Sequence, residues 1–379
     1  MPENPRQSWL VVGSHELKSS LQRPPRWQLS LLACPAEAMV PTVDGSRLYR
    51  VPLTGWLPGR ALVLDQDGTV LDQCPAALDD LQGHGPLVPL GLLRPDGAAF
   101  SLHAHVDTYA GHARFITVPT QPVEFRLAPA RLLAAIDEHF LKVNNYLCFR
   151  VKLQPDVELE HKFTLVDHPD VWTLARETLS MVGAGGLAGW LVEFREEIQG
   201  WDFLNHVYAI DEPEEDAGYV SFIPTTDGRH TVKRKIFSVD TDERPELRNR
   251  GVDVGGDFEA YLAETMRLTP AWHASFRRIR YDVSVESIET GNVFGIAYDR
   301  STIIDDAGSP VPGADELTQC EIEYIYSQSL APIDFDSVRA DLGRLRVLMS
   351  DYFARRSIEN YQRHESKLTY LRSQHAAAR

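Results

Sequence analysis

Two short segments of the sequence share one arrangement of acidic side chains. Glu158 and Glu160 alternate with other residues in VELEHKFTL, and Glu321 and Glu323 do the same in CEIEYIYS. Side chains two positions apart lie on one face of a β-strand, so each pair of carboxylates projects to one side. Clustered glutamate oxygens favour a hard divalent cation such as Mg²⁺ or Mn²⁺. These segments predict a metal site built from strands.

Basic side chains alternate in the same way on the first of these segments and on two others. For one strand alone, charges on the solvent face would be the simpler explanation. Acid pairs on some strands and basic pairs on others indicate instead that these side chains face the interior of a barrel. Buried charges are stable there only if they bind a partner or a ligand. Lys and Arg favour phosphate oxygens, so the interior would hold a metal-bound polyphosphate. The basic residues are Lys162 in VELEHKFTL, Lys233 and Lys235 in HTVKRKIF, and Arg278 and Arg280 in FRRIRYDV. For the two arginines, a solvated face together with Arg277 is the alternative.

The elements that must position these residues lie in the C-terminal half. Helices are expected at about 169–198 and 257–268, between strand-like segments. Eight antiparallel strands are enough to close a barrel. We therefore expect an α+β fold with an eight-stranded antiparallel β-barrel at 146–330 and a helical segment at 331–379. The candidate strands are YLCFRVKL, VELEHKFTL, FLNHVYAID, GYVSFIP, HTVKRKIFSV, FRRIRYDVSVESI, VFGIAYDRSTII and CEIEYIYS.

The ExExK pattern of VELEHKFTL, with its apolar flanks, resembles the signature of the CYTH superfamily, also called triphosphate tunnel metalloenzymes. YAID around Asp211, VKRK, FRRIRYDV, AYDRSTI and CEIEY are similar to later strands of that family, so the resemblance covers about residues 150–330. It implies a tunnel whose carboxylates bind one or two divalent cations and whose basic residues bind a triphosphate. Family members hydrolyse inorganic triphosphate, thiamine triphosphate or RNA 5′-triphosphate ends, or cyclise ATP, and a relative polymerises polyphosphate.

The resemblance also implies a role for each charged position. The reaction would be metal-assisted attack of water on a terminal phosphorus. Asp211 and Asp299 could simply end strands or begin turns instead. The implied roles are catalysis for Glu158, Glu160 and Lys162, substrate binding for Lys162, Lys233, Lys235, Arg278 and Arg280, and metal binding for Glu158, Glu160, Glu321 and Glu323, with Asp299 as a weaker candidate.

One strand departs from the family pattern. The third strand usually carries Arg, whereas GYVSFIPT has none, and His230 or Arg234 could replace it only with a change of register. The departure favours one alternative to a hydrolase, a catalytically inactive sensor that binds a nucleotide or polyphosphate. A nucleotidyl cyclase of the same fold, which would require a base-binding pocket, is a separate alternative.

Residues 1–125 predict a separate, small β-rich domain of unknown role. Asp-Gly pairs at 44–45, 67–68 and 96–97 lie between short apolar runs, which is a strong hairpin signal. From 126 to 145 the apolar residues Leu132, Ile136, Phe140 and Val143 have helical spacing. This segment predicts a helix that links the two domains.

Two further motifs have simpler explanations than chemistry. DQDGT, with Asp65 and Asp67, matches a pattern of haloacid-dehalogenase-type phosphatases, but a Pro- and Gly-rich segment follows it where that family needs a helix. A plain hairpin is favoured. GAGGLAG at 183–189 fits a loose dinucleotide fingerprint, but WTLARETLSM before it is helical rather than a strand, so a tight helix turn or packing site is favoured.

LHAHVDTYAGH offers four residues that could bind a metal. His103, His105 and Asp107 alternate on one strand face, and His112 is nearby. Alternating polar residues also mark the solvent face of any half-buried strand, and this explanation is favoured.

Composition limits the class of protein. The 379 residues, 43% hydrophobic and 24% charged, suggest about two globular domains. A net charge of −16 argues against nucleic acid or an anionic membrane as partner. No apolar run is long enough for a signal peptide or a membrane span, so a cytoplasmic location is expected. The four cysteines, Cys34, Cys74, Cys148 and Cys320, share no metal or redox spacing and are expected to be reduced.

The C-terminal segment carries one apolar stripe. Val338, Leu342, Leu345, Met349 and Tyr352 follow each other at helical spacing. We expect the stripe to pack on the barrel or on a second subunit, and the spacing also permits a coiled-coil contact in a homodimer.

Overall fold

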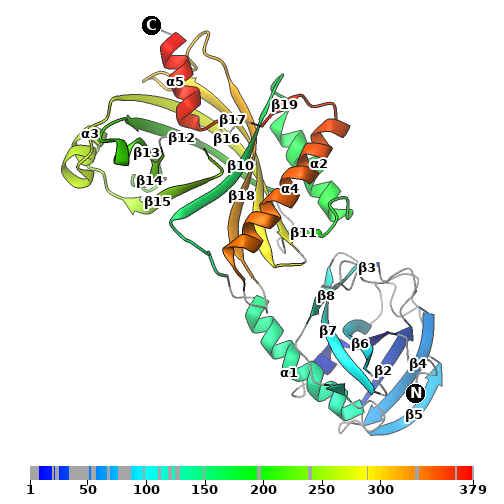
Figure 1. The fold of residues 1–379 in the computed structure, drawn as a ribbon. Coiled ribbons are helices and arrows are strands. Elements are labelled where there is room, and N and C mark those ends of the chain that lie inside the picture. The colour runs from blue at the N-terminus through cyan, green and yellow to red at the C-terminus, as the bar shows by residue number, and fades with distance from the viewer. Residues whose placement is uncertain are drawn as a thin grey trace. The chain divides into compact units, whose positions relative to one another are not determined.

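The computed structural model describes most of the chain, and its contacts divide the chain into two units (Figure 1). The N-terminal unit comprises Met1–Arg150 and Gln328–Pro332, and the C-terminal unit comprises Val151–Ser327 and Ile333–Arg379. The described residues are 8–18, 21, 25–33, 51–52, 57–65, 69–75, 87–96, 99–109, 112–117, 122–123, 129–147, 150–193, 198–237, 241–287, 289–328, 333–362 and 365–377.

The described part of the N-terminal unit is a nine-stranded antiparallel sheet with one helix against it. The strand order is β3-β8-β7-β6-β1-β2-β4-β5, with β9 paired to β7. A short 3₁₀ helix, His15–Lys18, follows the first strand. The strands are β1 (Trp9–Ser14), β2 (Arg26–Ala33), β3 (Val51–Pro52), β4 (Leu57–Asp65), β5 (Val70–Pro75), β6 (Leu87–Asp96), β7 (Ala99–Tyr109), β8 (His112–Thr117) and β9 (Pro122–Val123).

The helix expected at 126–145 is present as α1 (Pro129–Leu147). Its Leu132, Leu133 and Ile136 have no exposed surface and share a core with the strand residues Leu29 and Leu90. The helix therefore contributes to the core of the N-terminal unit, because its apolar stripe covers one face of the sheet.

The hairpin interpretation of DQDGT is confirmed. β4 ends at Asp65 and pairs antiparallel with β5, and the Asp65 carboxylate accepts a 2.9 Å hydrogen bond from the Thr69 amide. β6 and β7 pair antiparallel with Asp96 opposite Ala99, so the hairpin expected around 96–97 is confirmed. Asp67 and the pair at 44–45 lie outside the described residues.

His103 and His105 lie on β7 without a metal-binding arrangement among the described residues. Burial lowers the pKa of His103 to about 4, and Arg94 adds to this shift. His105 is buried and contacts the Phe140 ring, with centroids 5.7 Å apart. The side chains of Asp107 and His112 lie outside the description.

The C-terminal unit contains a closed eight-stranded antiparallel barrel, so the α+β fold is confirmed. Strands β16, β12, β13, β14, β15, β10, β18 and β17 pair in that order, and β17 pairs back to β16. Two short strands add to it, β11 on β16 and β19 on β10. The strands are β10 (Val157–Leu165), β11 (Trp190–Val192), β12 (Ile198–Ile210), β13 (Gly218–Pro224), β14 (His230–Ile236), β15 (Glu243–Val252), β16 (Trp272–Ser287), β17 (Asn292–Ile304), β18 (Leu317–Ser327) and β19 (Asn360–Tyr361).

One of the eight expected barrel strands was wrong and one real strand was missed. The described residues of YLCFRVKL form no strand: α1 continues to Leu147, and Val151 forms an isolated bridge to Ser327. Its place is taken by β15, whose sequence ERPELRNRGV has few apolar residues. The strand lacks the alternation of apolar residues by which the other strands were predicted.

Helices cover the outer face of the barrel. α2 (Val171–Gly183) and α4 (Phe335–Arg355) share a core with outward side chains of β10, β17 and β18. The stripe of α4 is buried in this core, so packing on the barrel is confirmed for Val338, Leu345 and Met349. α3 (Phe258–Tyr261) continues into a π-helical turn, Leu262–Met266, and α5 (Lys367–Ala377) is the last of the described helices.

GAGGLAG lies at the C-terminal end of α2, as the helix-turn interpretation predicted. The Ala184 amide donates to the Ser180 carbonyl, and Gly185 has a positive φ of 78° that favours glycine.

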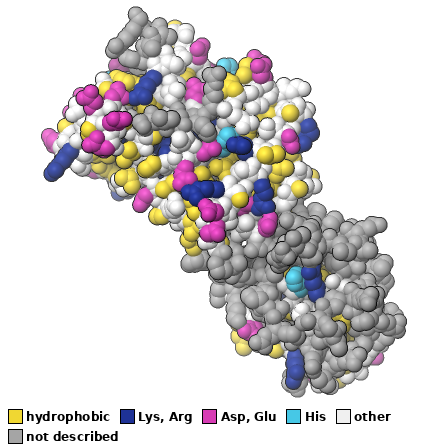
Figure 2. Space-filling model, in the orientation of Figure 1, with side chains coloured by type: hydrophobic (Ala, Val, Ile, Leu, Met, Phe, Trp, Pro, Cys, Tyr) yellow, Lys and Arg dark blue, Asp and Glu magenta, His cyan; other side chains and the backbone are white. Residues whose placement is uncertain are grey.

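Two features bear on cellular location and partners. Among the described residues, no helix is long and apolar enough to cross a membrane. On the face shown in Figure 2, acidic and basic side chains of the C-terminal unit are interspersed with hydrophobic ones. The cytoplasmic location remains a prediction.

Candidate functional site

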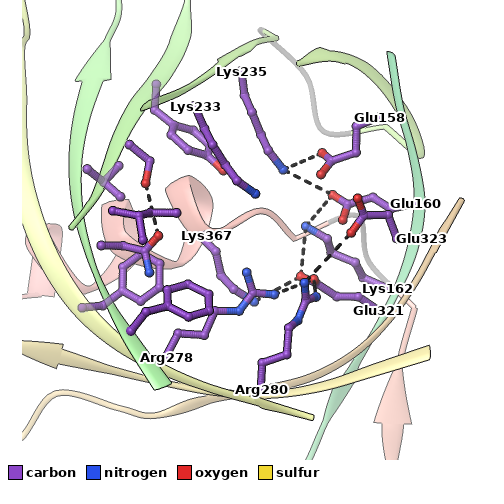
Figure 3. A pocket seen from close by; sticks show the side chains of 17 residues that line it. Glu158, Glu160, Lys162, Lys233, Lys235, Arg278, Arg280, Glu321, Glu323 and Lys367 are labelled. Atoms are coloured by element: carbon purple, nitrogen blue, oxygen red, sulfur yellow. Dashed lines mark hydrogen bonds and ion pairs between the residues drawn. The ribbon is translucent and has the colours of Figure 1, made fainter. Parts of the chain in front are cut away.

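Around β10, β17 and β18 the barrel has apolar side chains on its outer face and charged side chains inside. On β10, Leu159 and Phe163 belong to the outer core, whereas Glu158, Glu160 and Lys162 line a cavity in the barrel (Figure 3). Alternation along a strand places these two sets on opposite faces. The outer helices supply the apolar partners, so the interior is free to be polar.

Three carboxylates meet in this cavity. One oxygen from each of Glu158, Glu160 and Glu323 lies within 4.8 Å of the other two, and Glu160 is directly opposite Glu323 in the pairing of β10 with β18. Burial, and then the neighbouring Glu160 carboxylate, raise the pKa of Glu158 to about 8. Burial also disfavours the Glu160 carboxylate, but Lys162 and Lys235 hold its pKa below the usual value. We name these three residues the carboxylate triad.

The other two predicted metal ligands lie among cations. Asp299 has no exposed surface and accepts a 2.7 Å hydrogen bond from Nε of Arg280, while Arg278 also binds it. Glu321 accepts from both guanidinium groups and lies 3.2 Å from the ammonium of Lys367. The predicted acids therefore form two groups, the carboxylate triad and this ion-pair cluster.

The predicted lysines also reach the cavity. Lys162 lies 2.8 Å from Glu160, and Lys235 lies 2.5 Å from Glu158. Lys233 lies 3.9 Å from Glu246, and burial lowers its pKa to about 8. Each of these three lysines is therefore paired with a carboxylate.

Four charged residues of the site were missed from the sequence. Arg244, Glu246 and Arg248 alternate on β15, and Arg244 lies 2.9 Å from Glu160. Their spacing repeats the alternation of the ExExK strand and could have been found by searching for charge rather than apolar periodicity. Lys367 enters from the first residue of α5, and nothing in its local sequence signals this role.

Several other charged residues lie outside the cavity. Asp211 is exposed and pairs with Arg372. Arg234 pairs with Asp216, His230 contacts the Phe258 ring, and neither lines the cavity. The two possible substitutes for a basic third strand are thus absent from the interior.

The arginines of FRRIRYDV were expected either on a solvated face or in the interior, and Arg277 differs from its neighbours in this respect. Its guanidinium is exposed and donates a 2.8 Å hydrogen bond to Asp202, whereas Arg278 and Arg280 line the cavity or contact its acids. The strand therefore has one solvated Arg and two interior ones.

α5 packs against one part of the barrel wall. Its Leu368 and Leu371 are buried in a cluster with Val207, Tyr219 and Phe276. This packing carries Lys367 into the cavity, where its ammonium lies 3.5 Å from Asp299.

Comparisons with known proteins do not name a family for this chain. No family model matches it, and no curated protein matches it. Among solved structures, a chain of the Schizosaccharomyces pombe Mediator head module matches with 10% identity and a TM-score of 0.32, covering 52% of this chain and 96% of that chain. A similarity of this size carries no argument about fold or function.

Proposed function

We propose that the C-terminal unit belongs to the CYTH superfamily and is a metal-dependent phosphohydrolase. Its substrate would contain a triphosphate, as inorganic triphosphate, thiamine triphosphate or a nucleoside triphosphate do. One observation carries this proposal: the carboxylate triad and several Lys and Arg side chains line the same buried cavity. Oxygen ligands for a hard cation and donors for phosphate oxygens are both needed to bind a metal polyphosphate.

The carboxylate triad fits Mg²⁺ or Mn²⁺. Its donors are all carboxylate oxygens, within 4.8 Å of one another, and Glu158 and Glu160 are buried. A cation bound by Glu158, Glu160 and Glu323 would act as a Lewis acid on phosphate oxygens.

The interior cations would bind and orient the phosphates. Arg278, Arg280, Lys162 and Lys367 surround Glu321, and Lys235 lies between Glu158 and Glu246. Phosphate oxygens can replace these carboxylates as partners, because the same ammonium and guanidinium groups bind both. In a cavity shielded from water, fixed cations also stabilise the charge that develops on the transferred phosphoryl group.

A sensor without hydrolytic activity is the second candidate. The strand β13 lines the cavity with Tyr219, Ser221 and Ile223 and adds no cation to it. Weaker stabilisation of the transition state would leave binding without turnover.

The test is phosphate release from tripolyphosphate, ATP and thiamine triphosphate with Mg²⁺ or Mn²⁺, in wild-type protein and in Glu160→Gln. Arg277→Ala serves as the control, since that side chain points outside. Turnover that is lost only in Glu160→Gln supports the hydrolase. Tight binding by calorimetry without turnover supports the sensor, and neither binding nor turnover overturns both.

A further inference from the structure

The cavity has a charged side and an uncharged side. Figure 3 shows the labelled Glu158 and Glu160 opposite a group of unlabelled side chains that carry no charge. These uncharged residues come mainly from two neighbouring strands, β12 and β13, and we name them the neutral wall. They are Phe203, Asn205 and Val207 on β12, and Tyr219, Ser221 and Ile223 on β13.

Cations flank the neutral wall on both sides. Phe203 lies opposite Arg278 in the pairing of β12 with β16, and the guanidinium carbon is 5.9 Å from the Phe203 ring centroid. Ser221 lies opposite Lys233 in the pairing of β13 with β14. Phosphates bound by Arg278 and Lys233 would therefore leave the rest of a substrate against the neutral wall.

The neutral wall contains a buried donor without a partner. Asn205 is only 5% exposed, and its Oδ1 accepts a 3.2 Å hydrogen bond from the Ser221 hydroxyl. Nδ2 of the same amide has no hydrogen-bond partner in the described structure. A buried donor of this kind is costly, so it points to an acceptor supplied by a ligand.

Packing of α5 explains only part of the neutral wall. Val207, Tyr219 and Phe276 belong to the cluster with Leu368 and Leu371 of α5, but Phe203 lies outside that cluster and is partly exposed. Phe203 lines the cavity one inward position away from Asn205 on the same strand. An aromatic face next to a hydrogen-bond donor is suited to a planar ring that carries an acceptor atom.

We propose that the neutral wall binds the heteroaromatic part of an organic triphosphate. Phe203 supplies apolar contact for the ring, and Asn205 Nδ2 donates to a ring nitrogen or carbonyl oxygen. The substrate class is then a triphosphate ester with a planar base, rather than inorganic triphosphate. This inference rests on the proposed function, because the cations and the carboxylate triad hold the phosphates.

The test compares triphosphates that differ only in what the phosphate chain carries. Calorimetry with Mn²⁺ would measure the affinity of wild-type protein for tripolyphosphate, methyl triphosphate, thiamine triphosphate, ATP, GTP, CTP and UTP. At least one ring-bearing compound should bind about tenfold or more tightly than methyl triphosphate. This gain in affinity is what one hydrogen bond together with contact to the ring would provide. Asn205→Leu keeps the volume but removes the donor, and should reduce this preference while methyl triphosphate binds as before.

A second variant tests the wall in the opposite direction. Ser221→Arg places a cation on β13, and should strengthen tripolyphosphate binding while weakening the ring-bearing compound. If every ring-bearing triphosphate binds no better than methyl triphosphate, or if Asn205→Leu leaves the preference unchanged, this inference is overturned and the proposed function stands. If no triphosphate binds at all, the proposed function fails instead.

Discussion

Glu160 on β10 lies directly opposite Glu323 on β18, and one oxygen of each lies within 4.8 Å of a Glu158 oxygen. Like charges directly opposite each other on a sheet destabilise it. The protein compensates with Lys162, Lys235 and Arg244 around Glu160. A divalent cation bound between the two carboxylates would remove the remaining repulsion between them.

Glu160→Gln should therefore weaken Mn²⁺ binding by at least about tenfold, because it removes a charged ligand and keeps the shape of the side chain. The loss of the free Mn²⁺ signal in electron paramagnetic resonance measures this affinity. Arg277→Ala, outside the barrel, should bind Mn²⁺ as the wild type does. Equal affinities in Glu160→Gln and wild type would remove Glu160 from the metal site.

Arg278→Ala should weaken tripolyphosphate binding by about tenfold to a hundredfold, the range for a hydrogen bond to a charged group. Its neighbour Arg277 pairs with Asp202 on the outside, so Arg277→Ala should leave the affinity unchanged. Calorimetry on the two variants compares adjacent arginines of one strand. Similar losses in both would contradict the placement of Arg278 in the cavity.

The affinity for phosphate should depend on pH through Lys233. Burial lowers its pKa to about 8, so its positive charge is present at pH 7 and is lost as the pH rises through 8. Tripolyphosphate binding, measured in EDTA to exclude metal, should therefore weaken between pH 7 and pH 9 relative to Lys233→Arg. The guanidinium keeps its charge over this range, and the comparison cancels titration of the phosphate itself. Parallel pH profiles for the two proteins would refute this role.

Phe163→Ala should destabilise the C-terminal unit by about 3–5 kcal/mol, the usual cost of removing a buried Phe. Phe163 has no exposed surface and contacts the Phe353 ring of α4 at 5.2 Å between centroids. Urea denaturation measures the change, and Phe163→Leu should cost less. A negligible effect would mean that β10 does not face α4 with this side chain.

The alternation of charge made much of the site predictable. Glu158, Glu160 and Lys162 share a strand face, and the structure places all three in one cavity, as the sequence suggested. The selection of Glu323 over Glu321 for the carboxylate triad depends on the register of β18 against β10 and on the arginines of β16. The sequence of one strand does not by itself determine its register against a strand that is distant in the chain.

The missed residues have two causes. Arg244 and Glu246 lie on a strand whose inward and outward positions are both largely polar, so apolar periodicity does not mark it. Lys367 reaches the site only because Leu368 and Leu371 anchor α5 against the barrel. Such long-range packing is decided by tertiary contacts rather than by local sequence.

The most direct test of the proposed function is the rate of phosphate release from a triphosphate as Mn²⁺ is titrated, in wild-type protein and in Glu323→Gln. A phosphohydrolase with its metal held by the carboxylate triad should require Mn²⁺ for turnover, and the variant should need at least about tenfold more Mn²⁺ or have no turnover. Turnover that is independent of metal, or identical metal dependence in the two proteins, would contradict it.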